Sequence, residues 1–167
     1  MFPFRIGMGY DVHRLAEGIP FMLGGVKIDH THGSAGHSDA DVLLHAICDA
    51  LLGAAGLRDI GFHFPDNSDE FKGIDSKILL KRVVDLVTQN GWKIGNIDCT
   101  IALQRPKISG YIPLMQEKIE SVTGSGAGSI SVKATTTERL GFTGREEGVA
   151  AWAVAIIYRP EKADDPK

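Results

Sequence analysis

This sequence lacks a long apolar run, a basic stripe and a secretory leader, and each absence excludes a class of protein. No apolar stretch approaches the roughly 18 residues that cross a bilayer. The first residues, MFPFRIG, have neither the basic start nor the long apolar core of a signal peptide. The net charge is −3 and the basic residues are scattered, which argues against a nucleic-acid partner. We therefore expect no membrane and no nucleic acid as partners, and the missing transit peptide favours the bacterial cytoplasm over a plastid.

Cysteine is also scarce. Cys48 and Cys99 are too few for a disulfide framework, which favours a reducing compartment. The 167 residues suit one domain with a sizeable core, and no repeat or low-complexity block divides them. We expect residues 1–158 to form that domain and the polar residues 159–167 to be a frayed tail.

The periodicity of apolar residues predicts an α+β fold. Strands are expected over residues 4–11, 92–103, 129–135 and 148–158, a hairpin over 21–28, and helices over 39–57, 76–89 and 111–122. Ser38 is expected to cap the first helix. The stretch HTHGSAGHSDAD, residues 30–41, and residues 59–73 read as loops, and one helical turn is expected between residues 136 and 147. Hairpins mixed with alternating strands and helices predict a single domain with a mixed β-sheet covered on one face by helices.

The stretch GYDVHR places two metal-binding side chains on one strand. Asp11 and His13 point to the same face because strand residues alternate, and Val12 is expected to point to a core on the other face. His45 follows on the first helix, on one face with Asp41 and Asp49 at spacings of four residues. One carboxylate and two imidazoles suit a catalytic zinc site with an open fourth position. A surface polar cluster without metal remains the alternative at this point.

Two other stretches suit phosphate chemistry. His37 and Ser38 precede the first helix, where free N–H groups favour an anion, although Ser38 would cap the helix in any case. The segment KATTTERLGFTGREEG offers hydroxyls and Glu138 to a diphosphate and its metal, or is simply a Thr-rich strand end. Arg145 could hold a phosphate or pair with Glu146 or Glu147. The Pro-fixed loop at Lys107 could present backbone groups to a nucleobase or be an exposed turn.

Long motifs in a fixed order resemble one enzyme family. They are RIGMGYDVHRL, LGGVKI, HSDADVLLHAICDALLGAAGLRDIGFHFPD, FKGIDS, GNIDCTIALQRPKI and VKATTTERLGFTGREEGVA. Together they resemble the 2-C-methyl-D-erythritol 2,4-cyclodiphosphate synthases of the non-mevalonate isoprenoid pathway, from Arg5 to Tyr158. The resemblance implies that residues 1–158 are a phosphorus–oxygen lyase domain. It would convert 4-diphosphocytidyl-2-C-methyl-D-erythritol 2-phosphate to the 2,4-cyclodiphosphate and release CMP.

The resemblance also implies a homotrimer with active sites between subunits. Zinc would be held by Asp11, His13 and His45, and a second divalent ion, Mg²⁺ or Mn²⁺, by Glu138. The implied catalytic residues are His37, Thr136 and Glu138. The implied substrate-binding residues are Ser38, Asp59, Asp66, Pro106, Lys107, Ile108, Ala134, Thr135, Thr136 and Thr137, with Phe142 and Arg145 at a trimer axis that could take an isoprenoid diphosphate.

Two rival functions remain open from the sequence. A trimeric binding protein for isoprenoid diphosphates would need Phe142 and Arg145 but not an intact set of metal ligands. A zinc hydrolase would need a general base for a bound water, and Asp41 or Asp49 could supply it. The Thr-rich segment and the nucleoside loop favour the synthase over both.

Overall fold

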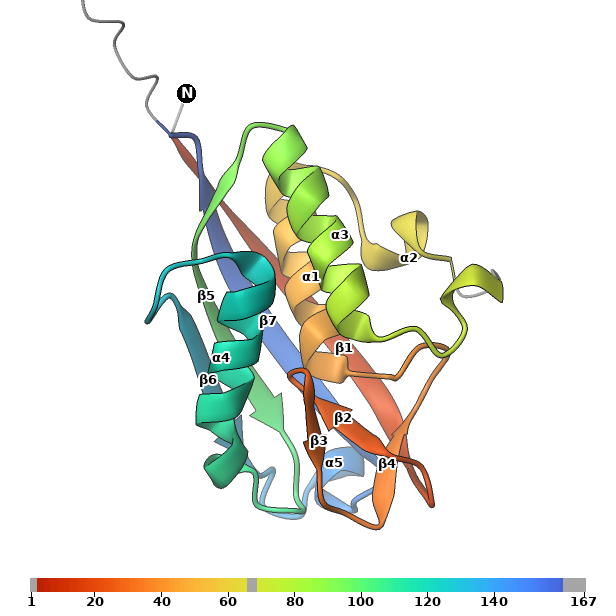
Figure 1. Ribbon diagram of the computed structural model, residues 1–167. Helices are drawn as coiled ribbons and strands as arrows, with labels where there is room; N and C mark the ends of the chain where they lie inside the picture. Colours follow the sequence, from red (N-terminus) through yellow and green to blue (C-terminus); the bar gives the residue numbers. More distant parts are fainter. Residues whose placement is uncertain (1–2, 66–68, 161–167) are drawn as a thin grey trace, which may run out of the picture.

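The computed structural model describes residues 3–65 and 69–160, which form a sheet with a layer of helices on one side (Figure 1). The main sheet has five strands in the order β4-β1-β7-β5-β6. β5 and β6 run parallel and the other neighbours run antiparallel, so the sheet is mixed, as predicted. The bounds are β1 Phe4–Glu17, β4 His32–Ala35, β5 Lys93–Ala102, β6 Ile130–Thr135 and β7 Gly148–Tyr158, with a separate hairpin of β2 Phe21–Leu23 and β3 Val26–Ile28.

Three long helices cover one face of this sheet, which confirms the predicted fold class. α1 lies between the sheet and α3, and is therefore buried on most sides (Figure 1). The bounds are α1 Val42–Ala55, α3 Ser76–Gln89 and α4 Ile112–Thr123, with short turns α2 Ile60–His63, η1 Asp69–Phe71, η2 Ser109–Tyr111 and α5 Gly141–Gly144. None of the helices within the described ranges combines the length and the apolar character that a bilayer crossing requires.

Two glycines let α1 lie unusually close to β1. A Cβ atom at Gly7 would lie 2.0 Å from the carbonyl oxygen of Ala50, and one at Gly9 would lie 2.0 Å from that of Ala46. Both contacts are with helix backbone, so any side chain here would force the helix away from the strand. Ala46 and Ala50 are one helical turn apart and present the matching small surface. This close packing brings His45 over the strand that carries Asp11 and His13.

Most of the other face of β1 and β7 is not covered by any described helix; the short α5 packs only against the start of β7, where Phe142 lies over Gly148. Alternate residues of β1 and their partners on β7 expose large apolar side chains there, including Met8 at 65% and Ile6 at 60% of full exposure. The members of this open apolar face are Phe4, Ile6, Met8, Tyr10, Val12, Trp152, Val154 and Tyr158. Val12 was expected to face a core; instead it is 42% exposed, because no element among the described residues covers it on this side of the sheet.

Several helices and strands have other bounds in the structure than the sequence predicted. β1 continues to Glu17 because it pairs with β4, a strand that was read as loop. α1 begins at Val42, so the expectation that Ser38 caps it is wrong. Asp41 is the cap and accepts a hydrogen bond from the N–H of Leu44 at 3.1 Å. The predicted loop over residues 59–73 contains α2 and η1.

Candidate active site

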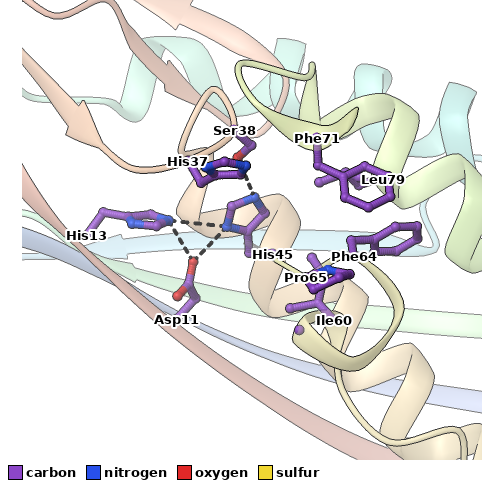
Figure 2. A pocket seen from close by; sticks show the side chains of 11 residues that line it. Asp11, His13, His37, Ser38, His45, Ile60, Phe64, Pro65, Phe71 and Leu79 are labelled. Carbon is purple, nitrogen blue, oxygen red and sulfur yellow. Dashed lines mark hydrogen bonds and ion pairs between the residues drawn. The ribbon is translucent and has the colours of Figure 1, made fainter. Parts of the chain in front are cut away.

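Asp11, His13 and His45 form a triangle of metal-donor atoms where β1 meets α1 (Figure 2). Asp11 Oδ2 lies 3.0 Å from His13 Nε2 and 3.0 Å from His45 Nδ1. The two imidazole nitrogens lie 3.2 Å apart. Strand alternation supplies the first two groups, as the sequence predicted, and the close packing of α1 against β1 brings the third to them.

The charges around the triangle favour a cation. Burial alone would raise the pKa of Asp11, but the hydrogen bonds and charges of His13 and His45 outweigh it and lower that pKa to about 2. Burial would likewise lower the pKa of His45, yet the hydrogen bond and charge of Asp11 raise it. The carboxylate is therefore ionised at neutral pH and attracts positive charge to this point.

The donor set fits zinc. Three ligands held tetrahedrally at ~2.0–2.1 Å from zinc would lie about 3.3 Å apart, close to the 3.0–3.2 Å edges of the triangle. Two imidazoles and a carboxylate suit zinc better than magnesium, which prefers oxygen ligands. The triangle therefore has the donor groups and the donor spacing of a divalent-metal site.

The far nitrogen of His45 contacts two serines. Ser38 Oγ lies 3.1 Å and Ser76 Oγ 3.0 Å from His45 Nε2. Ser76 Oγ in turn donates to Asp39 Oδ1 at 2.5 Å. Neither Asp39 nor Ser76 was selected from the sequence as a site residue, because their contact joins segments 37 residues apart.

The triangle forms one wall of a hollow of about 440 Å³. His37 and Ser38 continue the polar wall on which the triangle lies (Figure 2). The opposite wall is apolar and was not predicted; it consists of Ile60, Gly61, Phe64, Pro65, Phe71 and Leu79. The hollow can therefore hold a molecule with a charged end at the triangle and a carbon skeleton against the other wall.

A second hollow, of about 170 Å³, lies where β5 and β6 end. The residues that line it include six that the sequence selected: Pro106, Lys107, Ile108, Ala134, Thr135 and Thr136. The Arg105–Pro106 peptide bond is cis. Of the described residues, none lines both hollows.

The segment after β6 turns sharply. Glu138 is exposed and has a positive φ of 51°, and its Oε1 accepts a hydrogen bond from Thr136 Oγ1 at 3.1 Å. Thr137 instead donates to the carbonyl of Leu140 at 2.7 Å, within its own turn. The Glu138 carboxylate is thus presented outward beside the second hollow.

The remaining predicted residues lie at several places. Asp59 is exposed and caps α2 through the N–H of Phe62 at 2.9 Å, next to the first hollow. Arg145 follows α5, which carries Phe142, and makes paired contacts of 3.0 Å each with Glu147. Asp66 and most of the predicted tail, residues 161–167, lie outside the described residues.

Asp41 and Asp49, the two carboxylates that could have served as the base of a zinc hydrolase, both accept hydrogen bonds from backbone N–H groups. Asp41 is fully buried and accepts hydrogen bonds from the N–H groups of Gly24 and Gly25 at 2.9 and 2.7 Å. It therefore joins the β2–β3 hairpin to α1, and the expectation that it could serve as a base is wrong. Asp49 accepts a hydrogen bond from the N–H of Ile60 at 2.7 Å and holds the wall of the hollow.

The fold and the triangle together define an α+β protein with a divalent-metal site at one face of its sheet. The chain belongs to the YgbB family, whose sequence profile matches residues 4–158. This confirms the resemblance that the motifs indicated.

Named relatives agree with this membership. A 2-C-methyl-D-erythritol 2,4-cyclodiphosphate synthase of Porphyromonas gingivalis is 61% identical over 155 residues, which is 93% of this chain and 96% of that protein. The protein of the same name from Bacteroides thetaiotaomicron is 60% identical, over 93% of this chain and 98% of its own.

Solved structures share the fold. The bifunctional IspDF of Campylobacter jejuni matches with a TM-score of 0.92 and 42% identity over 96% of this chain, which spans only 43% of that protein. Plasmodium falciparum IspF, solved as a CDP complex, matches with a TM-score of 0.83 and 34% identity over 96% of this chain and 100% of its own.

Proposed function

We propose that this chain is a lyase of non-mevalonate isoprenoid synthesis. It converts 4-diphosphocytidyl-2-C-methyl-D-erythritol 2-phosphate to 2-C-methyl-D-erythritol 2,4-cyclodiphosphate and CMP. The observation that carries the proposal is the metal triangle of Asp11, His13 and His45 in a hollow with a polar and an apolar wall. Relatives with 60–61% identity bear the name of this synthase.

The reaction needs positioning more than reactive side chains. An oxygen of the 2-phosphate forms a bond to the β-phosphorus, and the bond from that phosphorus to the oxygen shared with the α-phosphate breaks. The electron pair leaves with CMP. Since the nucleophile belongs to the substrate, the protein has to fold the substrate back on itself and neutralise its charge.

The first hollow suits the methylerythritol and phosphate end of the substrate. Ile60 and Phe64 would contact its carbon skeleton, while Asp59, with Asp66, would bind hydroxyls. His37 and Ser38 would contact the 2-phosphate from the polar wall. Zinc held by the triangle would supply Lewis-acid polarisation of a phosphate oxygen.

The second hollow suits the cytidine end. Pro106, Lys107 and Ile108 would enclose the base, with Ala134 and Thr135 on the other side. Thr136 and Thr137 would contact the diphosphate. Glu138, whose outward carboxylate offers the oxygen donors that Mg²⁺ or Mn²⁺ prefers, would hold the second divalent ion.

A homotrimer would bring the two hollows together between subunits. Two features support this assembly: no described residue lines both hollows, and the members of the open apolar face stay exposed in the described part of the chain. Closed rotational symmetry would let identical chains bury that face and contribute one hollow each. Phe142 and Arg145 would then lie near the axis, where an isoprenoid diphosphate would have to displace Glu147 from Arg145. The quoted bacterial relatives support the bacterial cytoplasm as the location.

CMP release in the presence of Mg²⁺ tests the proposal directly. Protein loaded with zinc should release CMP and form the cyclic diphosphate, and removal of zinc by a chelator should stop both until zinc is returned. His45→Ala should release no CMP. Glu138→Gln should release CMP far more slowly than wild type, and added Mg²⁺ should no longer raise its rate. A folded, zinc-loaded protein that releases no CMP would overturn the synthase and favour the diphosphate-binding protein.

A further inference from the structure

We propose that Ser76 and Asp39 are positioning residues that fix which nitrogen of His45 binds the metal. This inference rests on the proposed zinc site and adds a second layer of residues to it. Ser76 begins α3 and is completely buried, and Asp39 lies in the segment before α1. Neither lines the first hollow. Both therefore act on the site through His45.

The direction of the hydrogen bonds follows from the donors and acceptors that are present. A carboxylate only accepts, so the 2.5 Å contact fixes the Ser76 hydroxyl proton on the line to Asp39 Oδ1. The oxygen of Ser76 then has only lone pairs to offer to its other neighbours. His45 Nε2, 3.0 Å away, must therefore be the donor in their contact and carry a proton.

A protonated Nε2 leaves Nδ1 as the nitrogen with which His45 can bind a metal. Nδ1 is the atom that faces the triangle: without a metal it donates to Asp11 Oδ2 at 3.0 Å, and a bound metal would take the place of that proton. The chain Asp39–Ser76–His45 therefore keeps the other proton on Nε2 and leaves Nδ1 for the metal. Histidine ligands of metals are held in this way by groups behind them, and the loss of such a group costs about 10- to 100-fold in metal affinity or activity.

Ser38 cannot replace Ser76 in this role. Its hydroxyl lies 3.1 Å from His45 Nε2, but no carboxylate of the described residues contacts it to fix the direction of its proton. It accepts a hydrogen bond from the N–H of Ala40 at 3.1 Å and lies 3.4 Å from Ser76 Oγ. Because Ser76 has committed its own proton to Asp39, Ser38 is the donor in that last contact. The direction of the Ser38 hydroxyl proton therefore follows from the hydrogen bond between Ser76 and Asp39.

Backbone hydrogen bonds hold the two segments together. The N–H of Asp39 donates to the carbonyl of Ile74 at 3.0 Å, and the N–H of Gly73 donates to the carbonyl of His37 at 2.7 Å. The N–H of Ser76 also donates to Asp39 Oδ2 at 3.2 Å. The start of α3 therefore fixes both the support of His45 and the polar wall that contains His37 and Ser38.

Zinc affinity of the full-length protein, measured by competition with a chromophoric chelator, tests this chain. Ser76→Ala should weaken zinc binding about 10-fold or more. Asp39→Asn should also weaken it, because an amide can donate as well as accept and no longer fixes the serine proton. The double variant should bind zinc about as weakly as Ser76→Ala alone, since Asp39 reaches His45 through the Ser76 hydroxyl and its contacts with the N–H groups of Ser76 and Asp41 can be kept by the oxygen of an amide. Ser34→Ala is the matched control: its buried hydroxyl has no hydrogen-bond partner among the described residues, so zinc affinity should not change.

The outcomes separate the two proposals. If His45→Ala binds zinc as tightly as wild type, the proposed zinc site is wrong. If His45→Ala loses zinc while Ser76→Ala stays within about twofold of wild type, the zinc site stands and the positioning role is wrong. Additive losses for Asp39→Asn and Ser76→Ala would show two independent structural effects and would also overturn it. The absorption spectrum of the Co²⁺-substituted protein gives a second readout, and it should change in Ser76→Ala but not in Ser34→Ala.

Discussion

Neighbouring residues of β1 serve different purposes because the strand separates two environments. Asp11 and His13 face α1 and hold the metal site, while Met8 and Val12 face the open side of the sheet. The ligand pair could be predicted from alternation alone. The exposure of Val12 could not, because alternate apolar residues look the same whether a helix or a second chain covers them.

At the same scale, the buried thiol of Cys99 leads to a prediction about how the stability of the fold depends on pH. Burial, with a smaller contribution from the Asp98 charge, raises the pKa of its thiol from 9.0 to about 12. Between these values the unfolded chain loses the thiol proton and the folded chain keeps it. The free energy of unfolding should therefore fall as pH rises above 9, by up to about 1.4 kcal/mol per pH unit from this one group.

Urea unfolding from pH 8 to pH 11 measures this effect. Cys99→Ala should be less stable at pH 8 because a buried sulfur is lost, but its stability should fall less steeply with pH. Equal slopes for the variant and the wild type would contradict the assignment.

At the scale of elements, helices and strands with a clear apolar periodicity were predicted from the sequence. Elements that depend on contacts with distant segments were not. α3 and β7 have the predicted bounds, Ser76–Gln89 and Gly148–Tyr158. β4 is a polar, Gly-containing stretch that becomes a strand only by pairing with β1. The start of α1 was misplaced because the N–H groups of a distant hairpin hold the Asp41 carboxylate.

The contact between β1 and α1 predicts the effect of Gly9→Ala. The new Cβ would lie 2.0 Å from the carbonyl oxygen of Ala46 and 2.7 Å from the nitrogen of Ala50, so the helix must move. We expect a loss of about 1–3 kcal/mol in stability. Zinc affinity should fall as well, because His45 would move away from Asp11.

Thermal unfolding and zinc competition measure the two effects. Gly53→Ala is the control on the same helix, since a Cβ there meets nothing within 4 Å. Alanine is the better helix former by about 1 kcal/mol, so this variant should be as stable as wild type or more stable, with unchanged zinc binding. A Gly9→Ala protein with normal zinc affinity would show that the site does not depend on this close packing.

At the scale of the whole molecule, the open apolar face predicts how the chain assembles. Met8 is 65% exposed and has no covering element within the described chain. Met8→Glu should leave the fold of one chain intact but prevent assembly, because a charge cannot be buried between identical faces without a partner. Ile78→Glu makes the same kind of change on α3, where Ile78 is 47% exposed, and should not alter assembly. Light scattering after size exclusion measures the mass of each variant, and a Met8→Glu trimer would exclude this face from the interface.

Mixing two inactive variants tests whether each active site uses two chains. His45→Ala removes a ligand from the first hollow, and Glu138→Gln changes the carboxylate beside the second. If neighbouring subunits of a trimer share each site, random reassembly of equal amounts restores both native halves at about a quarter of the sites. CMP release by the mixture should then approach that fraction of the wild-type rate, although each variant alone is inactive. The variants must be unfolded and refolded together, and mixing them after separate refolding is the control. If both hollows served one site within a single chain, every site would carry one defect and the mixture would remain inactive.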